Sequence, residues 1–222
     1  MKKYAIIVAG GKGVRMGKEI PKQFIPIGGI PILMRTIQAF YDFDPDIAII
    51  LALPQDQQVH WQTLCKEYHF EIPVIVVNGG DTRYQSVKNA LDKIETEGIV
   101  AVHDGVRPFI SKEILTTAYE TAAQKGSAIP VIPVTDSIRK IGKNQTSFAC
   151  NRSNYCFVQT PQTFKIGWLK QAYSSPYHPD FTDDASVVEQ SGFNVFTING
   201  HPKNIKITTP IDLILAETFL KP

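Results

Sequence analysis

The feature that most constrains the fold is the alternation of short apolar runs with segments of helical spacing. The apolar runs are rich in Val and Ile and lie at residues 4–9, 46–53, 73–77, 99–103 and 127–134. Continuous apolar runs of this length are typical of parallel strands that are covered on both faces. Apolar stripes at helical spacing lie between them, at residues 33–41, 59–68, 87–94 and 115–122. The sequence therefore predicts an α/β fold with a doubly wound, mostly parallel sheet.

The alternation of apolar runs and helical segments stops after Pro133. Residues 136–155 are mostly polar and carry the turn-forming residues Gly142, Asn144 and Asn151. We interpret them as a projecting, hairpin-like arm of one domain that spans residues 1–222, and not as a separate domain.

Two capping patterns predict where the later helices begin. A helix is expected near residues 166–173, and the next one near 182–190, with Thr182 as its N-cap. The last helix should start at Thr209, with Pro210 at the first helical position and Asp212 three residues after the cap.

Composition excludes several classes of protein. The 222 residues include 23 Lys and Arg against 21 Asp and Glu, and this net charge of +2 does not favour a nucleic-acid or membrane-surface partner. The three cysteines, Cys65, Cys150 and Cys156, include no CxxC pair, which argues against a zinc site or a disulfide framework. No run approaches the ~20 apolar residues of a membrane span, and the first apolar run is too short for a signal peptide. We expect a cytoplasmic protein.

A glycine-rich loop follows the first predicted strand. It reads AGGKGVRMG over residues 9–17, and Lys22 lies shortly after it. Glycines allow backbone N–H groups to approach an anion closely, and Arg15 and Lys22 add two cations, so the loop could hold a triphosphate. Met16 breaks the dinucleotide fingerprint, while Lys12 and Glu19 break the P-loop pattern. The alternative is a glycine-rich turn whose charges face solvent.

Polar residues also follow the third predicted strand. Gly79, Gly80 and Asp81 come directly after it, and Ser86 opens the next helix. This segment could contact a base and a ribose. The alternative is a tight turn that Asp81 caps.

The fourth predicted strand ends in His103-Asp104-Gly105-Val106-Arg107. Asp104 offers a hard oxygen ligand suited to Mg²⁺, and Arg107 can clamp a phosphate with two donors. The alternative for Asp104 is an ion pair with Arg107 across the turn. We interpret His103 as a packed or hydrogen-bonded strand residue.

A further cation lies late in the chain. Lys206 is expected inside an apolar strand over residues 204–208, where an unpaired ammonium group is costly. Arg139 and Lys140 are expected on a solvated surface.

Together these segments resemble the 2-C-methyl-D-erythritol 4-phosphate cytidylyltransferase family. The matching motifs span nearly the whole chain in the family's order: AGGKGVRMG, PKQF, GGDTRYQSV, HDGVRPF, TDSIRK, QTPQTF, TDDAS and NIKITTP. The resemblance implies a nucleotidyltransferase fold and a CTP-dependent reaction. In that reaction the phosphate oxygen of methylerythritol phosphate attacks the α-phosphate of CTP and releases pyrophosphate.

The resemblance also implies roles for individual residues. Arg15 and Lys22 match the catalytic pair that stabilises the five-coordinate α-phosphate, and we place Lys206 with them at the reacting phosphate. Asp104 matches the Mg²⁺ ligand. The positions that match nucleotide contacts are Ala9, Gly10, Gly11, Gly13, Gly79, Gly80, Asp81, Ser86 and Gly105. The positions that match acceptor contacts are Arg107, Ser137, Arg152 and Thr160.

The family is homodimeric, and the resemblance implies that Arg152 on the arm reaches the site of the second subunit. Two alternatives stay open. One is ribitol-5-phosphate cytidylyltransferase, which shares the first loop and the segments around Asp104 and Lys206. The other is a nucleotide-binding regulator without catalysis, which would have no need of Arg15, Lys22 and Asp104 together.

Overall fold

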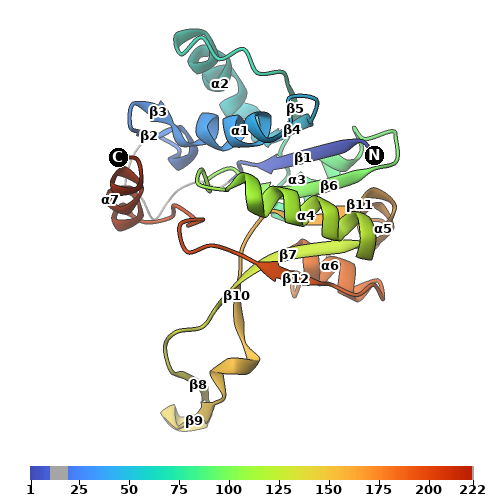
Figure 1. Ribbon diagram of the computed structural model, residues 1–222, viewed down its shortest axis with the longest axis vertical. Helices are drawn as coiled ribbons and strands as arrows, with labels where there is room; N and C mark the ends of the chain where they lie inside the picture. Colours follow the sequence, from blue (N-terminus) through green and yellow to red (C-terminus); the bar gives the residue numbers. More distant parts are fainter. Residues whose placement is uncertain (11–19, 222) are drawn as a thin grey trace.

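The computed structural model describes residues 1–10 and 20–221, and a mixed, mostly parallel sheet between two layers of helices forms its centre (Figure 1). The strands of this sheet are β1 (Lys3–Val8), β4 (Ala48–Leu53), β5 (Val74–Asn78), β6 (Ile99–Asp104), β7 (Ser127–Pro133), β10 (Cys156–Val158), β11 (Gln162–Lys165) and β12 (Thr197–Asn199). Their order is β10-β7-β11-β6-β1-β4-β5, with β12 beside β7. Neighbours from β6 to β5 are parallel, whereas β10 and β11 run antiparallel to theirs. The predicted fold class is confirmed.

Both faces of the sheet are covered at its centre, which explains the continuous apolar runs of β1, β4 and β6. Alternate residues of β1 enter different cores: Ile7 packs on one face and Ile6 on the other, and both are fully buried. The first face is covered by α1 (Ile32–Phe43), α2 (Gln55–Glu67) and α4 (Lys112–Lys125). The second is covered by α3 (Arg83–Leu91), α5 (Ile166–Ala172) and α6 (Asp184–Gln190).

A third, smaller core lies beside the sheet. It joins α7 (Pro210–Phe219) to the short ribbon of β2 (Pro26–Ile27) and β3 (Ile30–Pro31), which follows the 3-10 helix η2 (Lys22–Phe24). Each element is too small to bury an apolar face alone. None of the helices described between residues 1–10 and 20–221 is long and apolar enough to cross a membrane.

The capping predictions succeed at one helix and fail at another. Thr209 and Asp212 form the predicted capping box of α7, with Pro210 in its first turn. Thr182 does not cap α6. The cap is Asp183, whose carboxylate accepts a hydrogen bond from the Ser186 backbone N–H at 2.9 Å. Asp183 has an extended backbone directly before the helix, and the Ala185 N–H that Thr182 could cap donates instead to the Gln162 side-chain oxygen at 2.9 Å.

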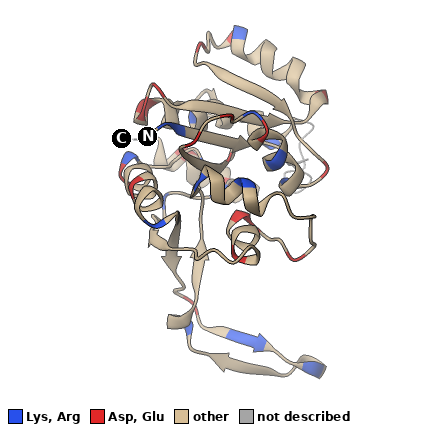
Figure 2. Cartoon of the chain, turned by 90° about the vertical axis from the view of Figure 1, so that its right-hand side faces the viewer, with Lys and Arg blue, Asp and Glu red and all other residues tan. Residues whose placement is uncertain are grey.

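The arm projects away from the sheet (Figure 1). Its strands β8 (Ile138–Ile141) and β9 (Ser147–Cys150) form a separate antiparallel ribbon, followed by the 3-10 helix η4 (Arg152–Asn154); η3 (Lys143–Gln145) connects the two strands. The ribbon and its turns carry Lys and Arg but no Asp or Glu over residues 138–155 (Figure 2). Ile141, Phe148 and Tyr155 are exposed on it. The arm therefore presents basic and apolar side chains that its own chain leaves uncovered.

Gly126 should tolerate a side chain poorly. It ends α4 with φ +98°, and an added Cβ would lie 2.1 Å from the Trp168 ring. We expect Gly126→Ala to lower the free energy of unfolding in urea by about 1 kcal/mol through left-handed strain, and by about 1–3 kcal/mol more through overpacking. Gly192→Ala is the matched control, since Gly192 also has positive φ (+84°) but no described atom near its added Cβ. Equal losses in the two variants would rule out the Trp168 contact as the cause.

Candidate active site

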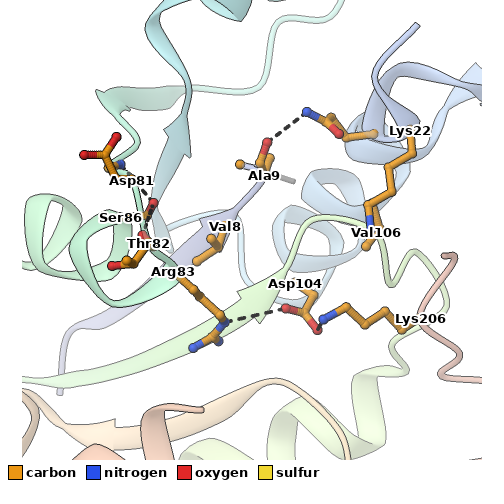
Figure 3. A pocket seen from close by; sticks show the side chains of 13 residues that line it. Val8, Ala9, Lys22, Asp81, Thr82, Arg83, Ser86, Asp104, Val106 and Lys206 are labelled. Carbon is orange, nitrogen blue, oxygen red and sulfur yellow. Dashed lines mark hydrogen bonds and ion pairs between the residues drawn. The ribbon is translucent and has the colours of Figure 1, made fainter. Parts of the chain in front are cut away.

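A pocket of about 230 Å³ opens where β1, β5 and β6 end (Figure 3). The carboxyl ends of parallel strands meet at one edge of such a sheet, which is where α/β proteins bind ligands. Five segments line the pocket: the end of β1, η2, the start of α3, the end of β6 and the segment before α7. The lining residues are Val8, Ala9, Gly10, Lys22, Gln23, Gly80, Asp81, Thr82, Arg83, Ser86, Asp104, Val106 and Lys206.

The position of Lys22 is set by its neighbour Gln23. The buried Gln23 amide donates to the Ala9 carbonyl at 2.9 Å and to the Gln57 side-chain oxygen at 2.6 Å. These bonds fasten η2 to the end of β1 and to α2. The Lys22 side chain extends from this turn along the pocket (Figure 3). Gln23 has no assigned role in the sequence analysis, because only its place in the motif PKQF could have drawn attention to it.

The Gly79-Gly80 segment forms the opposite side. The Ser86 hydroxyl accepts a hydrogen bond from the Gly80 N–H and donates one to the Thr82 carbonyl, both at 3.0 Å. The predicted alternative of a turn capped by Asp81 is wrong, because Thr82 is the N-cap of α3 and accepts from the Gln85 N–H. Asp81 lies at the lining of the pocket.

Three cations surround Asp104. Its Oδ2 lies 3.1 Å from Lys206 Nζ and 3.2 Å from Arg107 Nε, while its Oδ1 lies 3.9 Å from Arg83 Nε. Burial alone would raise the pKa of the Asp104 carboxyl, but Lys206, Arg83 and Arg107 outweigh it and hold the pKa well below its usual range. Asp104 is therefore a carboxylate at neutral pH.

Lys206 reaches this cluster from a segment that is not a strand. The expectation of a strand over residues 204–208 is wrong: the segment is irregular, and its Ile207 N–H bonds to the Val106 carbonyl. Both sides of β6 are already paired, with β1 and β11, so the segment crosses the end of the sheet. The Lys206 side chain is 42% exposed and pairs with Asp104, so it does not bear the cost of burying an unpaired ammonium group.

His103 lies behind Asp104 and is fully buried. Burial lowers its pKa to about 4, so the ring is neutral at pH 7. Its Nε2 is 3.1 Å from the Arg107 carbonyl and its Nδ1 is 3.1 Å from the Thr160 hydroxyl. It is a hydrogen-bonded strand residue, as the sequence analysis predicts.

A bidentate ion pair supports the α3 side of the pocket. Arg83 donates to the two oxygens of the fully buried Asp184 at 2.8 and 2.6 Å, and the Tyr173 hydroxyl donates to the same carboxylate at 2.6 Å. No role at the site is predicted from the sequence for Arg83 or Asp184. They are 101 positions apart, and only their places in the motifs GGDTRYQSV and TDDAS single them out.

The Asp104 carboxylate could hold a divalent cation here. Among residues 1–10 and 20–221, no group of three or more His, Cys, Asp and Glu side chains could hold a metal ion. Mg²⁺ in nucleotide sites is often bound by one or two carboxylates together with substrate phosphates and water. In the described part of the chain, Asp104 Oδ1 pairs with Arg83 at 3.9 Å, a longer distance than those at Oδ2. This ionised oxygen therefore fits a metal ion that arrives with a nucleotide.

The comparisons with known proteins decide the family. The family model for 2-C-methyl-D-erythritol 4-phosphate cytidylyltransferase matches residues 4–222. The chain belongs to this family. A relative of that name from Phocaeicola vulgatus is 51% identical over 99% of this chain and 100% of its own length. Another from Bacteroides thetaiotaomicron is 49% identical over the same shares.

Solved structures of family members agree. The crystal structure of the cytidylyltransferase from Francisella tularensis superposes with a TM-score of 0.82, at 32% identity, over 99% of this chain and 100% of that one. The structure from Thermus thermophilus gives 0.77 at 30% identity, over 99% and 98%. The resemblance drawn from the motifs is confirmed.

The structure of this family member brings most, but not all, of the expected site residues together. Those at the pocket lining are Ala9, Gly10, Lys22, Gly80, Asp81, Ser86, Asp104 and Lys206. Gly79, Gly105, Arg107 and Thr160 lie outside the lining but adjoin or contact it. Ser137 and Arg152 lie in the arm, where the Arg152 guanidinium donates to the Thr135 carbonyl. Gly11, Gly13 and Arg15 lie outside the described residues.

Proposed function

We propose that the chain transfers CMP from CTP to 2-C-methyl-D-erythritol 4-phosphate and releases pyrophosphate. The observation that carries the proposal is the convergence of Lys22, Lys206 and Asp104, from three distant segments, on one pocket in a chain of this family. Transfer of this kind needs little covalent chemistry from the protein, because positioning and charge stabilisation dominate. Cations arranged around one phosphorus serve both needs.

The nucleotide is proposed to bind between the first loop and the Gly79-Gly80 segment. The residues assigned to it are Ala9, Gly10, Gly11, Gly13, Gly79, Gly80, Asp81, Ser86 and Gly105. Ser86 already orients the Gly80 N–H, which supports a preformed binding surface for a base and ribose. Lys22 and Arg15 stabilise the negative charge that grows on the α-phosphate during attack.

Asp104 is proposed to hold Mg²⁺ together with the phosphates of CTP. When bound, the ion neutralises phosphate charge and orients the α-phosphate. Removal of divalent cations with EDTA should then abolish turnover, and added Mg²⁺ should restore it.

The acceptor phosphate is proposed to bind on the side of Arg107 and Lys206. Lys206 holds the attacking oxygen near the α-phosphate, while Arg107, Thr160, Ser137 and Arg152 bind the remainder of the acceptor. Arg107 is oriented for this task by Asp104 and by the Asn204 carbonyl, which its Nη1 contacts at 2.8 Å.

We further propose that the chain works as a homodimer in the cytoplasm, with residues 136–155 of one subunit completing the site of the other. Three large apolar side chains are exposed on the arm: Ile141, Phe148 and Tyr155. Exposed apolar patches of this kind favour contact with another protein surface, which supports docking of the arm on the second subunit. The basic charge of the arm suits a site that binds two phosphorylated substrates.

Mixed dimers test the exchange of Arg152. Arg152→Ala should weaken acceptor binding, and its KM should rise about tenfold or more because a charged contact to phosphate is lost. Dimers that combine one Arg152→Ala chain with one Lys22→Ala chain should recover part of the activity, since one of their two sites is intact. The measurement is turnover at an acceptor concentration below the wild-type KM, before and after the two impaired variants are unfolded and refolded together. No recovery would mean that each subunit completes its own site.

A pyrophosphate-release assay tests the proposed function. Purified chain is mixed with CTP, Mg²⁺ and either methylerythritol phosphate or ribitol 5-phosphate. We expect turnover with the first acceptor. Turnover only with ribitol 5-phosphate would show that this compound, and not methylerythritol phosphate, is the acceptor. No turnover with either would favour a nucleotide-binding regulator.

A further inference from the structure

A buried chain of hydrogen bonds runs behind the charged cluster. We propose that His103 is a positioning residue, which holds Asp104 and Arg107 in the orientation that the metal–nucleotide and the acceptor phosphate require. This inference rests on the proposed function, because it concerns residues of that site.

The proton positions in this chain follow from its geometry. A carbonyl can only accept, so the His103 Nε2 that lies 3.1 Å from the Arg107 oxygen must carry the hydrogen. With the hydrogen on Nε2, Nδ1 is the acceptor, and the Thr160 hydroxyl at 3.1 Å donates to it. The Thr160 oxygen in turn accepts from the Asp104 N–H at 3.1 Å. One tautomer therefore satisfies every group.

The two ends of this chain belong to one turn. The Asp104 carbonyl accepts from the Arg107 N–H at 3.1 Å, so residues 104–107 form a tight turn at the end of β6. His103 binds the Arg107 carbonyl directly, and it binds the Asp104 N–H through Thr160. A single imidazole thus fixes both ends of the turn that presents the carboxylate and the guanidinium.

The same chain reaches the segment of Lys206. Asn204, fully buried, donates from its side chain to the Thr160 carbonyl at 2.9 Å, and its own carbonyl accepts from Arg107. Thr160 therefore connects His103 both to Asp104 and to the segment that brings Lys206 to Asp104.

His103 itself does not line the pocket. It has no route to the substrates except through these neighbours, which distinguishes it from an acid–base catalyst. Packing is the competing explanation, since the ring also contacts Phe40 edge-on, with centroids 5.1 Å apart. A test must therefore separate the two hydrogen bonds from the volume of the ring.

Three variants make this separation. His103→Phe keeps a ring of similar size but makes neither hydrogen bond. The amide nitrogen of Gln reaches about as far as Nε2, so His103→Gln keeps the bond to the Arg107 carbonyl and loses the one to Thr160. The amide oxygen of Asn reaches about as far as Nδ1, so His103→Asn does the reverse.

In steady-state assays the three variants should differ in their Mg²⁺ requirement and in their KM for the acceptor. In His103→Gln we expect the Mg²⁺ concentration for half-maximal activity to rise about tenfold, with the KM for the acceptor near the wild-type value. In His103→Asn the KM for the acceptor should rise about tenfold, with the Mg²⁺ requirement unchanged. In His103→Phe both should rise. The proposal would be overturned if folded His103→Phe left both constants within about twofold of wild type, or if His103→Gln and His103→Asn changed the two constants in the same way.

A second measurement needs neither turnover nor variants that fold well. Nitrogen-15 NMR of the unliganded wild-type chain at pH 7 should report hydrogen on His103 Nε2 and none on Nδ1. The opposite tautomer would overturn the proposal. If wild-type chain releases no pyrophosphate, the proposed function fails, while the NMR result still decides whether the hydrogen-bond chain exists.

Discussion

Lys22→Ala should lower kcat at least about a hundredfold and change the KM for CTP by less than about threefold. The charge of Lys22 is proposed to act on the α-phosphate, where negative charge grows only as the transition state forms, so its loss affects the chemical step more than binding. Pyrophosphate release at varied CTP and acceptor concentrations measures both constants.

A matched control for this prediction is Lys66→Ala. Lys66 is a lysine of α2 that is exposed to solvent and does not line the pocket. Its replacement should leave kcat and KM unchanged. An unchanged kcat in Lys22→Ala would contradict the catalytic role of this lysine, and a raised KM at constant kcat would reduce the role to ground-state binding.

Arg83→Met should lower the free energy of unfolding by about 3–5 kcal/mol, the range observed when one partner of a buried ion pair is removed. Asp184 is fully buried, so loss of Arg83 leaves its carboxylate with the Tyr173 hydroxyl but without its cation. Urea unfolding at pH 7 measures the change.

Two further variants test the cause. Lys3→Met removes the ion pair between Lys3 and Asp44, whose side chains are 36% and 23% exposed, and should cost no more than about 1 kcal/mol. The double variant Arg83→Met with Asp184→Leu should recover part of the loss, since it also removes the buried carboxylate that Arg83 neutralises. A loss below about 1 kcal/mol in Arg83→Met would mean that Asp184 is solvated or finds another partner.

The strands and helices were predictable because their signal is local. The apolar runs of β1, β4 and β6 are buried on both faces, so consecutive residues are apolar. The run of β5 is apolar too, although this strand lies at the edge of the sheet and exposes Ile75 and Val76. The capping box of α7 is equally local, because Thr209 and Asp212 are three residues apart. The cap of α6 was predicted one residue early, because Thr182 and Asp183 are both good caps and only the backbone conformation selects Asp183.

The segment over residues 204–208 fails as a strand for a reason that is not local. Ile205 and Ile207 give it an alternating pattern, but a strand needs a free sheet edge to pair with. Both edges of β6 are already paired, one with β1 and the other with β11. This pairing depends on the order of strands in the whole sheet.

The sequence by itself determined the alternation of strands and helices, the family, and which polar residues follow the strands, because these depend on neighbouring residues or on ordered motifs. Only the tertiary structure decided which of those polar groups meet. Arg83 with Asp184, His103 with Thr160 and Lys206 with Asp104 are pairs that lie far apart along the chain. Contacts of this kind arise when strand order brings separate loops to one edge of the sheet, and no local spacing encodes that order.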